Sequence, residues 1–330
     1  MRVAVLDDYH RIAHTLADWS SLGVEVAFFD KPLAREELPK VLADFDTLVL
    51  MRERTAFPRE VLEQLPNLKL VITTGMRNDS LDVECLSSRG VRVCGTGIPG
   101  YGRSDALGAA NAPEPRGLPS TIEIAWALIF ALFKRVASED RAIRAGIWQQ
   151  GLPANLAGAT LGLAGLGRLG AKMVEPARVF GMDVIAWSEN LTPERAEEAG
   201  ALYVSKQELL AGSDVLSIHL VLSERTRGLI GAAELAEMKP TAFLVNTSRG
   251  PIVDEAALAG ALRERRIAGA GLDVYAVEPL PPDSDLLTLD NAVLTPHFGY
   301  VSVEGLTEMY VQVVEDIAAY LRGQPIRVID

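Results

Sequence analysis

Three side chains in the second half of the sequence have the types that chemistry on a small carboxylic acid requires. Arg249 lies in the segment NTSRGPIVD, Glu278 in LDVYAVEP and His297 in TPHFG. A guanidinium is a planar, permanently charged fork that can hold a carboxylate and polarise a keto oxygen. An imidazole can remove a hydroxyl proton and return it, and a carboxylate on its other ring nitrogen fixes the tautomer. Together the three types suit the interconversion of a hydroxyl and a keto group.

Each of these residues also has an ordinary structural explanation. A lone arginine after a strand is usually a surface cation, a glutamate before proline a solvated acid, and a lone histidine a hydrogen-bonded structural residue. Any one of them alone would favour that explanation, whereas three complementary types near successive strand ends favour chemistry. The other histidine of this half, His219, also ends a predicted strand. We expect it to border a cofactor rather than to act as the base.

A glycine-rich segment, GLGRLG, lies between an apolar run and the helical stretch AKMVEPARVF. Gly165 permits a tight turn, Gly167 lets the backbone approach a pyrophosphate, and Gly170 allows close contact between helix and strand. Amides at the start of the helix would face the phosphates. The pattern alone is weak evidence, since such turns also occur for packing, but its strand-before and helix-after context is met. It predicts a dinucleotide site formed by Gly165, Gly167, Arg168, Leu169 and Gly170.

The next predicted strand, in the segment DVIAWSEN, bears on which dinucleotide is bound. An acidic residue that binds the ribose is expected ~20 residues beyond the glycine turn. The strand ends in Ser188 and then Glu189. Glu189 could serve the 2′-hydroxyl of NAD, whereas the uncharged Ser188 would not repel a 2′-phosphate and Arg195 could meet one. We predict NAD, with NADP as the alternative, and we include Ser188 and Glu189 among the cofactor-binding residues.

Short apolar runs alternate with amphipathic stretches, which predicts parallel sheets covered on both faces. The first series of predicted strands is Val3–Leu6, Val24–Phe29, Thr47–Met51, Lys69–Thr73 and Val91–Cys94. The second series is Thr160–Ala164, Asp183–Trp187, Val215–His219, Ala242–Asn246, Ala268–Leu272 and Ala292–Thr295. Six strands with helical connections match a doubly wound dinucleotide-binding sheet, and ligands bind such sheets at the carboxyl ends of the strands. The segments that hold the arginine, the glutamate and the histidine all lie at such ends.

A Gly- and Pro-rich stretch, residues 95–119, separates the two series and cannot continue a helix or a central strand. We place the domain crossing there. A helix is expected to begin at Ser120 or Thr121 and to run to about Gly146. A last helical segment, Val303 to Leu321, could return to the first domain, and its periodicity leaves that question open.

The composition of the 330 residues, 48% apolar and 23% charged, is that of a globular protein. A net charge of -12 without a basic stretch argues against nucleic acid as a partner. The longest apolar run, Ile122 to Phe133, is too short to span a bilayer, so no membrane partner is expected. Cys85 and Cys94 lie in no metal-like or paired motif, which predicts reduced thiols and no metal site. With no signal-peptide pattern at the N-terminus, we expect a cytoplasmic protein.

These motifs resemble those of the D-isomer-specific 2-hydroxyacid dehydrogenases. GLAGLGRLG resembles the cofactor loop of the family and SIHLVLSERTRGLI its middle segment; MKPTAFLVNTSRGPIVDEAAL, GAGLDVYAVEP and TPHFG resemble its remaining signatures. They occur in the family's order. The resemblance implies that the arginine, glutamate and histidine described above are the catalytic residues. It also implies that Asp273 contacts the nicotinamide carboxamide and that Thr247 and Ser248 line the cofactor.

The N-terminal half carries two further similarities. VITTGMRN is similar to the substrate loop of the family, which implies that backbone amides around Gly75 and Met76 hold the substrate carboxylate. MRERT, with Arg52, is similar to another loop at the mouth of the site. The sequence departs from the family at Val221, where many members have proline, and at Ser188, where many have aspartate. The stretch from Tyr101 to Pro119 is also longer than the usual crossing.

The resemblance implies an α/β fold with two doubly wound parallel-sheet domains. One is a flavodoxin-like substrate (catalytic) domain, residues 1–118 and 301–330, and the other is a Rossmann NAD-binding domain, residues 119–300. Family members usually dimerise through the long helix after the crossing, so we expect a homodimer.

The expected function is hydride transfer between NAD(H) and a small D-2-hydroxy or 2-keto acid, such as glyoxylate or hydroxypyruvate. One alternative is a phosphoglycerate dehydrogenase without a regulatory domain, because the chain ends at Asp330. The other is a non-catalytic NAD(H)-sensing binding protein, against which the retention of all three catalytic residues argues. Similarity to formate dehydrogenases is weaker, because those enzymes lack the glutamate that Glu278 supplies here.

Overall fold

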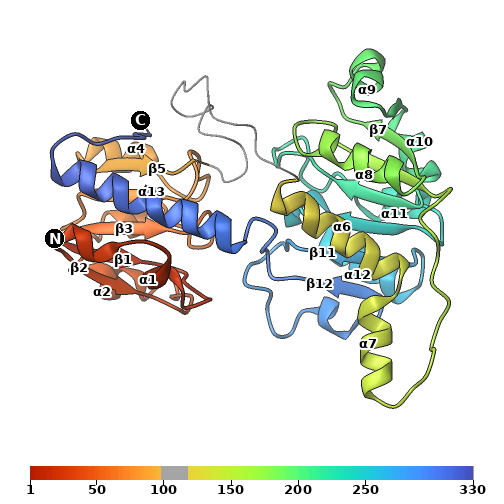
Figure 1. Cartoon of the computed structure of the whole chain (residues 1–330), viewed down its shortest axis with the longest axis horizontal. Helices are drawn as coiled ribbons and strands as arrows, with labels where there is room; N and C mark the ends of the chain where they lie inside the picture. The colour runs from red at the N-terminus through yellow and green to blue at the C-terminus, as the bar shows by residue number, and fades with distance from the viewer. Residues whose placement is uncertain (98–117, 330) are drawn as a thin grey trace. The chain divides into compact units, whose positions relative to one another are not determined.

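The computed structural model describes residues 1–97 and 118–329. The chain divides into two compact units (Figure 1). Unit 1 comprises Met1–Pro119 and Val301–Asp330, and unit 2 comprises Ser120–Tyr300. Unit 1 is therefore formed by two separate segments of the chain, one before and one after unit 2 in the sequence. Most of the Gly- and Pro-rich stretch in which we expected the crossing, residues 98–117, lies outside the described residues.

Unit 1 is built on a five-stranded parallel sheet with the order β2-β1-β3-β4-β5. This is the flavodoxin-like order, in which the winding reverses between β1 and β3. The two central strands β3 and β4, TLVL and LVIT, are buried along their whole length because helices cover both faces of the sheet. The strands are β1 (Arg2–Val5), β2 (Glu25–Phe28), β3 (Thr47–Leu50), β4 (Leu70–Thr73) and β5 (Arg92–Gly95).

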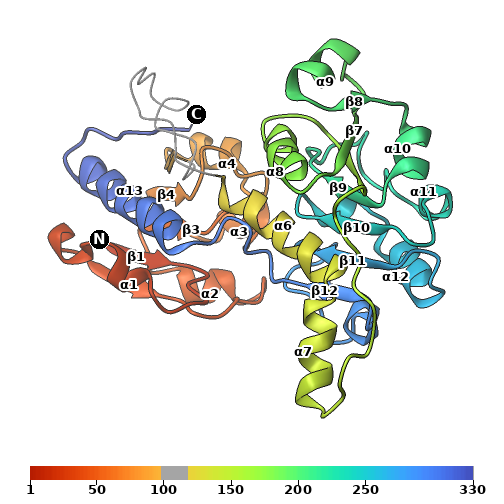
Figure 2. The same ribbon diagram turned by 45° about the vertical axis from the view of Figure 1, so that its right-hand side comes forward.

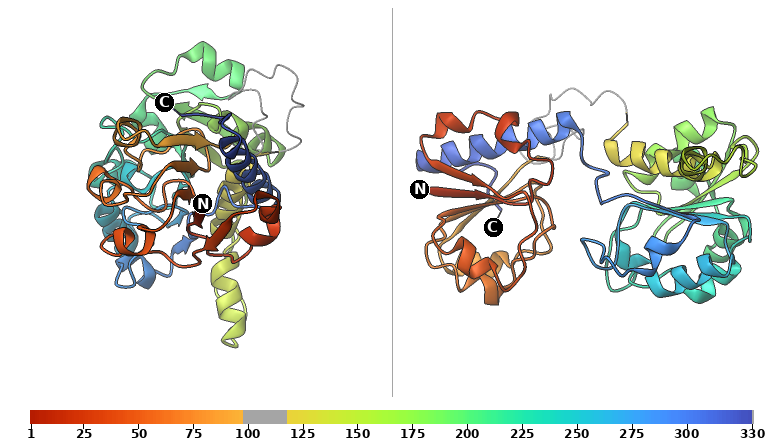
Figure 3. Two further views of the ribbon diagram at one scale, coloured as in Figure 1. Left: turned by 90° about the vertical axis from the view of Figure 1, so that its left-hand side faces the viewer. Right: turned by 90° about the horizontal axis from the view of Figure 1, so that it is seen from below.

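The longest helix of unit 1, α13, spans Val303–Leu321, the range that helical periodicity predicted. It packs with α1 and the 3-10 turn η1 on one face of the sheet, and α2, α3 and α4 pack in a row on the other (Figure 3, right). Beyond α13 the chain returns to β5, where Cys94 and Val328 form an antiparallel bridge. The shorter elements are α1 (Ala13–Leu16), η1 (Trp19–Leu22), α2 (Leu38–Leu42), α3 (Arg59–Leu62) and α4 (Val83–Ser88).

Unit 2 is built on a seven-stranded parallel sheet with the order β12-β11-β10-β9-β6-β7-β8. From β8 to β12 this is the doubly wound dinucleotide-binding order, with the reversal between β6 and β9. The helix α6 lies directly on β11, whose sequence GAGL has two glycines that leave room for it. The strands are β6 (Thr160–Ala164), β7 (Asp183–Trp187), β8 (Leu202–Tyr203), β9 (Val215–Ile218), β10 (Phe243–Asn246), β11 (Gly269–Leu272) and β12 (Ala292–Leu294).

The helix expected from Ser120 to about Gly146 is in fact two helices, and that prediction was wrong. α6 (Ser120–Phe133) is apolar and largely buried, and α7 (Val136–Arg144) is polar and projects from the unit (Figure 2). Arg135 separates them in a left-handed conformation with φ 56°. The remaining helices of unit 2 include α9 (Pro193–Ala199), α10 (Lys206–Gly212), α11 (Ala232–Glu237), α12 (Glu255–Arg263) and the 3-10 turn η4 (Asp285–Thr288).

The predicted fold class, two doubly wound parallel-sheet domains, is confirmed. The strand count of the second sheet was one too low, because the edge strand β8 is only two residues long and both residues are exposed. Among the described residues, no helix has both the length and the apolar character needed to cross a membrane.

Candidate active site

The glycine-rich segment forms the turn that follows β6. Gly165 has φ 100°, a conformation that other residues rarely adopt, and a methyl group on it would lie 2.6 Å from the carbonyl oxygen of His219. A methyl group on Gly170 would lie 2.1 Å from the carbonyl oxygen of Gly165. At Gly167 a methyl group would meet none of the described atoms within 4 Å. The protein itself thus requires two of the glycines, and the space beside Gly167 is open to a ligand.

The chain then enters a 3-10 turn, η2 (Gly170–Met173), which continues as α8 (Val174–Val179). Arg168 is exposed on the turn and Leu169 is half-buried beside it. This strand, turn and helix fit a dinucleotide, because an open cradle at Gly167 lets a pyrophosphate approach the backbone amides.

Replacing Gly167 by alanine should therefore raise the Kd for NADH at least about tenfold without changing the midpoint of thermal unfolding. The methyl group would enter only the space reserved for the phosphates. Gly170→Ala is the matched control, and it should lower the unfolding midpoint because its methyl group collides with backbone. Titration of NADH fluorescence and thermal melts of both variants test this prediction. An unchanged Kd for Gly167→Ala would show that the pyrophosphate does not bind at this turn.

The residues at and after the end of β7 are the candidates for contact with the ribose. Ser188 is half-buried directly after the strand, where its carbonyl oxygen accepts the amide of Leu191, and Glu189 is exposed. Arg195 is exposed in the first turn of α9, where its amide donates to the Thr192 hydroxyl. The end of β7 lies beside the glycine turn, since the amide of Gly165 donates to the carbonyl of Trp187.

His219 lies against the glycine turn rather than in the catalytic cluster. Its Cβ would be 3.5 Å from a methyl group on Gly170, and its ring nitrogen Nε2 is 2.9 Å from the Ser217 hydroxyl. Burial lowers the pKa of His219 to about 4, so the ring is neutral at pH 7. A neutral ring beside the turn can border a cofactor without adding charge.

Arg249 follows β10 in a tightly tied loop. The buried amide of Asn246 organises this loop, because its Nδ2 donates to the Arg249 carbonyl (3.0 Å) and its Oδ1 accepts the Ser248 amide (3.0 Å). The Ser248 hydroxyl donates to the carbonyl of Leu220 (2.5 Å), and the Arg249 guanidinium donates to the Ser248 carbonyl (2.8 Å). Sequence reasoning missed Asn246, although its place at the strand end could have indicated it.

Thr247 supplies a second observation that fits a bound ligand. Its residue is 8% exposed, and its hydroxyl oxygen has no hydrogen-bond partner in the described part of the chain. An unpaired buried hydroxyl costs about 1–3 kcal/mol. A cofactor hydroxyl or amide beside the loop would restore that hydrogen bond.

Asp273 follows β11 and is 1% exposed. Its Oδ1 accepts the Thr295 hydroxyl (2.6 Å) and the Phe298 amide (3.1 Å), and its Oδ2 accepts the Gly299 amide (2.9 Å). These three bonds fold residues 295–299 around the carboxylate. Asp273 therefore positions the loop that carries the histidine, a role that the sequence did not indicate.

His297 and Glu278 meet at the carboxyl edge of the same sheet. Nδ1 of His297 lies 2.5 Å from Oε2 of Glu278. Since a carboxylate only accepts, Nδ1 carries the proton and Nε2 is the nitrogen left for chemistry. His297 has φ 50°, a conformation held by the bonds to Asp273, and Oε1 of Glu278 accepts the amide of Tyr275 (2.9 Å). Hydrogen bonds to neighbouring residues therefore hold both His297 and Glu278 in position.

Tyr275 joins these loops, and sequence reasoning missed it. Its hydroxyl donates to the carbonyl of Thr295 (2.8 Å) beneath the histidine, and burial raises its pKa. A methyl group on Gly250 would lie 2.0 Å from the carbonyl carbon of Tyr275. The Arg249 loop therefore packs directly on the loop that presents Glu278.

In unit 1, Arg52 lies beside the predicted substrate loop. Its side chain donates to the carbonyl of Thr74 (3.1 Å), and a methyl group on Gly75 would collide with the guanidinium. The Gly75 amide, however, already donates to the hydroxyl of Thr96 (3.0 Å). This contact does not test the prediction that backbone amides around Gly75 and Met76 hold a carboxylate, and both residues stay candidates. Thr96 was missed, although its place directly after β5 puts it at the same sheet edge.

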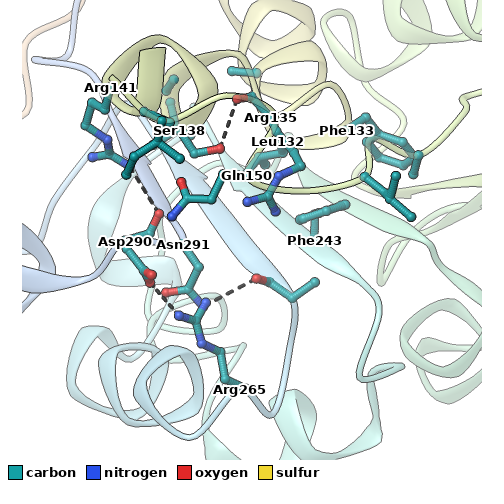
Figure 4. A pocket seen from close by; sticks show the side chains of 18 of the residues that line it. Leu132, Phe133, Arg135, Ser138, Arg141, Gln150, Phe243, Arg265, Asp290 and Asn291 are labelled. Atoms are coloured by element: carbon teal, nitrogen blue, oxygen red, sulfur yellow. Dashed lines mark hydrogen bonds and ion pairs between the residues drawn. The ribbon is translucent and has the colours of Figure 1, made fainter. Parts of the chain in front are cut away.

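A cavity of about 640 Å³ in unit 2 lies away from this cluster. It is lined where β10–β12 begin, whereas the catalytic candidates lie where those strands end. Its walls carry Arg135, Arg141, Arg265 and Gln150, with Arg265 paired to Asp290 (Figure 4). None of the catalytic candidates lines this cavity.

Comparison with known proteins adds to this geometry. A family model described as "D-isomer specific 2-hydroxyacid dehydrogenase, NAD binding domain" matches residues 126–299. A glyoxylate reductase of Korarchaeum cryptofilum is 36% identical, over 89% of this chain and 85% of the relative.

Two phosphoglycerate-related proteins are also similar. A D-3-phosphoglycerate dehydrogenase of Archaeoglobus fulgidus is 34% identical over 99% of this chain, which spans only 58% of the length of that relative. The crystal structure of a phosphoglycerate oxidoreductase from Vibrio cholerae is 32% identical, with a TM-score of 0.87 over 98% of this chain and 99% of that one.

Proposed function

Because the chain belongs to the D-isomer-specific 2-hydroxyacid dehydrogenase family, we propose that it reversibly reduces a small 2-keto acid to the D-2-hydroxy acid with NADH. The observation that carries this proposal is the contact of 2.5 Å between His297 and Glu278, backed by Asp273 at the carboxyl edge of a dinucleotide-binding sheet. Glyoxylate and hydroxypyruvate are the proposed substrates.

In the direction of reduction, His297 acts as an imidazolium with a proton on each ring nitrogen, and it gives the proton on Nε2 to the carbonyl oxygen of the substrate. Glu278 accepts the hydrogen bond from Nδ1, and its negative charge stabilises the positively charged ring before the proton is transferred. Arg249 holds the substrate carboxylate and polarises the keto group. NADH, when bound along the turn Gly165–Gly170, supplies the hydride that C2 receives. Oxidation of the hydroxy acid reverses each step, with His297 as the base.

The remaining residues bind rather than react. Thr247 and Ser248 line the cofactor, with Asp273 both positioning the histidine loop and available to the nicotinamide carboxamide. Ser188, Glu189 and His219 complete the proposed cofactor site. Arg52 and the backbone amides around Gly75 and Met76 are assigned to the substrate carboxylate.

We further propose a cytoplasmic homodimer. Large apolar side chains are exposed on α7 and on the segment after it, which supports burial of this surface by a second copy. They are Val136 (57%), Ile143 (50%), Ile147 (47%), Trp148 (76%) and Leu152 (95%). Light scattering that gives the mass of a single chain would refute the dimer.

A phosphoglycerate dehydrogenase activity is the second candidate, favoured by the relative from Archaeoglobus fulgidus. A panel of glyoxylate, hydroxypyruvate, pyruvate and 3-phosphohydroxypyruvate, each with NADH and with NADPH, tests both. We expect oxidation of NADH with the small keto acids. Tight NADH binding without oxidation by any keto acid would favour a nucleotide sensor instead.

A further inference from the structure

The loops that follow β3 and β4 in unit 1, residues 51–58 and 74–82, contain three arginines. Two of them pair with acids from their own loop. Nε of Arg52 lies 3.8 Å from Oε2 of Glu53, and both side chains are about one-fifth exposed, at 22% and 20%. Nε of Arg77 lies 2.7 Å from Oδ1 of Asp79, in a pair that is 77% and 65% exposed.

The side chain of the third arginine, Arg54, contacts the loop after β1. Its guanidinium stacks 4.7 Å from the centre of the Tyr9 ring and donates to the carbonyl of Asp7 (2.9 Å). The Asp7 carboxylate in turn accepts the hydroxyls of Tyr9 (3.0 Å) and Thr55 (2.9 Å). Moving Arg54 onto a ligand would break a cation–π contact and a hydrogen bond together.

The two ion pairs differ in strength because they differ in burial. Solvent screens the pair of Arg77 with Asp79. Glu53 lies in a half-buried loop, where the effective dielectric constant is lower and its charge acts more strongly on whatever Arg52 binds. Around Arg52 the positive charge is therefore already partly compensated before any substrate binds.

We propose that these loops select 2-keto acids whose only anionic group is the 2-carboxylate, and that Glu53 rejects substrates with a second anionic group. This inference rests on the proposed function. One carboxylate can share Arg52 and the amide of Met76, whereas a phosphate or second carboxylate beside Arg52 would also meet the negative charge of Glu53. Specificity of this kind comes from repulsion as well as attraction.

The test compares kcat/KM of the wild-type protein within two substrate pairs. Hydroxypyruvate is set against 3-phosphohydroxypyruvate, and 2-oxopentanoate against oxaloacetate, a dianion of similar size. We expect the monoanion to be preferred at least about tenfold in both pairs, since unfavourable charge contacts are costly at a binding site. Equal or faster turnover of the dianions would overturn the inference while supporting the proposed function, and no turnover of any keto acid would overturn the proposed function.

The variant Glu53→Gln assigns the selectivity to its source. Removal of this charge should reduce the ratio of kcat/KM between monoanion and dianion about fivefold, mainly because KM of the dianions falls. Asp79→Asn is the matched control, because its exposed pair with Arg77 is screened, and its preference should stay as in wild type. If Glu53→Gln keeps the full preference and binds NADH normally, Glu53 is not the discriminating residue. The wild-type comparison remains decisive even if a variant folds poorly.

Discussion

Replacing His297 by alanine should lower kcat for 2-keto-acid reduction by ~10²–10⁴-fold while the Kd for NADH stays unchanged. The imidazole is the proton donor, and its loop is held independently by the bonds of Asp273 to Phe298 and Gly299. The side chain can thus be removed without moving the backbone. Glu278 would keep its bond to the Tyr275 amide and so remain in place.

The control for this variant is His14→Ala, which removes an exposed histidine of α1. It should retain wild-type turnover. Steady-state rates with hydroxypyruvate and fluorescence titration with NADH measure the two quantities separately. Wild-type turnover in His297→Ala would rule out this histidine as the proton donor.

Replacing Arg249 by alanine should lower kcat/KM for the keto acid by about 10²–10³-fold, the cost of removing one preorganised donor to a developing charge. The loss should fall on both kcat and KM, because the same guanidinium holds the carboxylate and polarises the keto group. Its backbone is fixed by Asn246, so the loop should persist in the variant.

Arg249→Lys separates the charge from the fork geometry. Lysine keeps the positive charge but offers no bidentate contact, so it should recover only part of the loss. Arg227→Ala, at an exposed arginine of the same unit, is the neutral control. If Arg249→Ala changes only the affinity for NADH, this residue binds the cofactor and not the substrate.

Much of the fold was predictable from the sequence because its signals are local. The apolar runs of β6 and β7 match the predicted strands residue for residue, and α13 matches its periodic segment. The family resemblance, confirmed by the comparisons, depends on short motifs such as the glycine turn. The break at Arg135 was not predicted because it depends on the backbone conformation of one residue, and the edge strand β8 was not predicted because it is only two residues long.

The sequence by itself determined the residue types of the catalytic cluster and the strand ends at which they stand. Only the tertiary structure decided how they are held, because the partners come from distant segments. Asp273 orders a loop more than twenty residues later, and Tyr275 packs on Gly250 while it supports Glu278. The Gly75 amide donates to the hydroxyl of Thr96, which directly follows the neighbouring strand β5. Hydrogen bonds between these loops depend on which strand ends become neighbours and on the exact path of each loop, and short local motifs do not show those pairings.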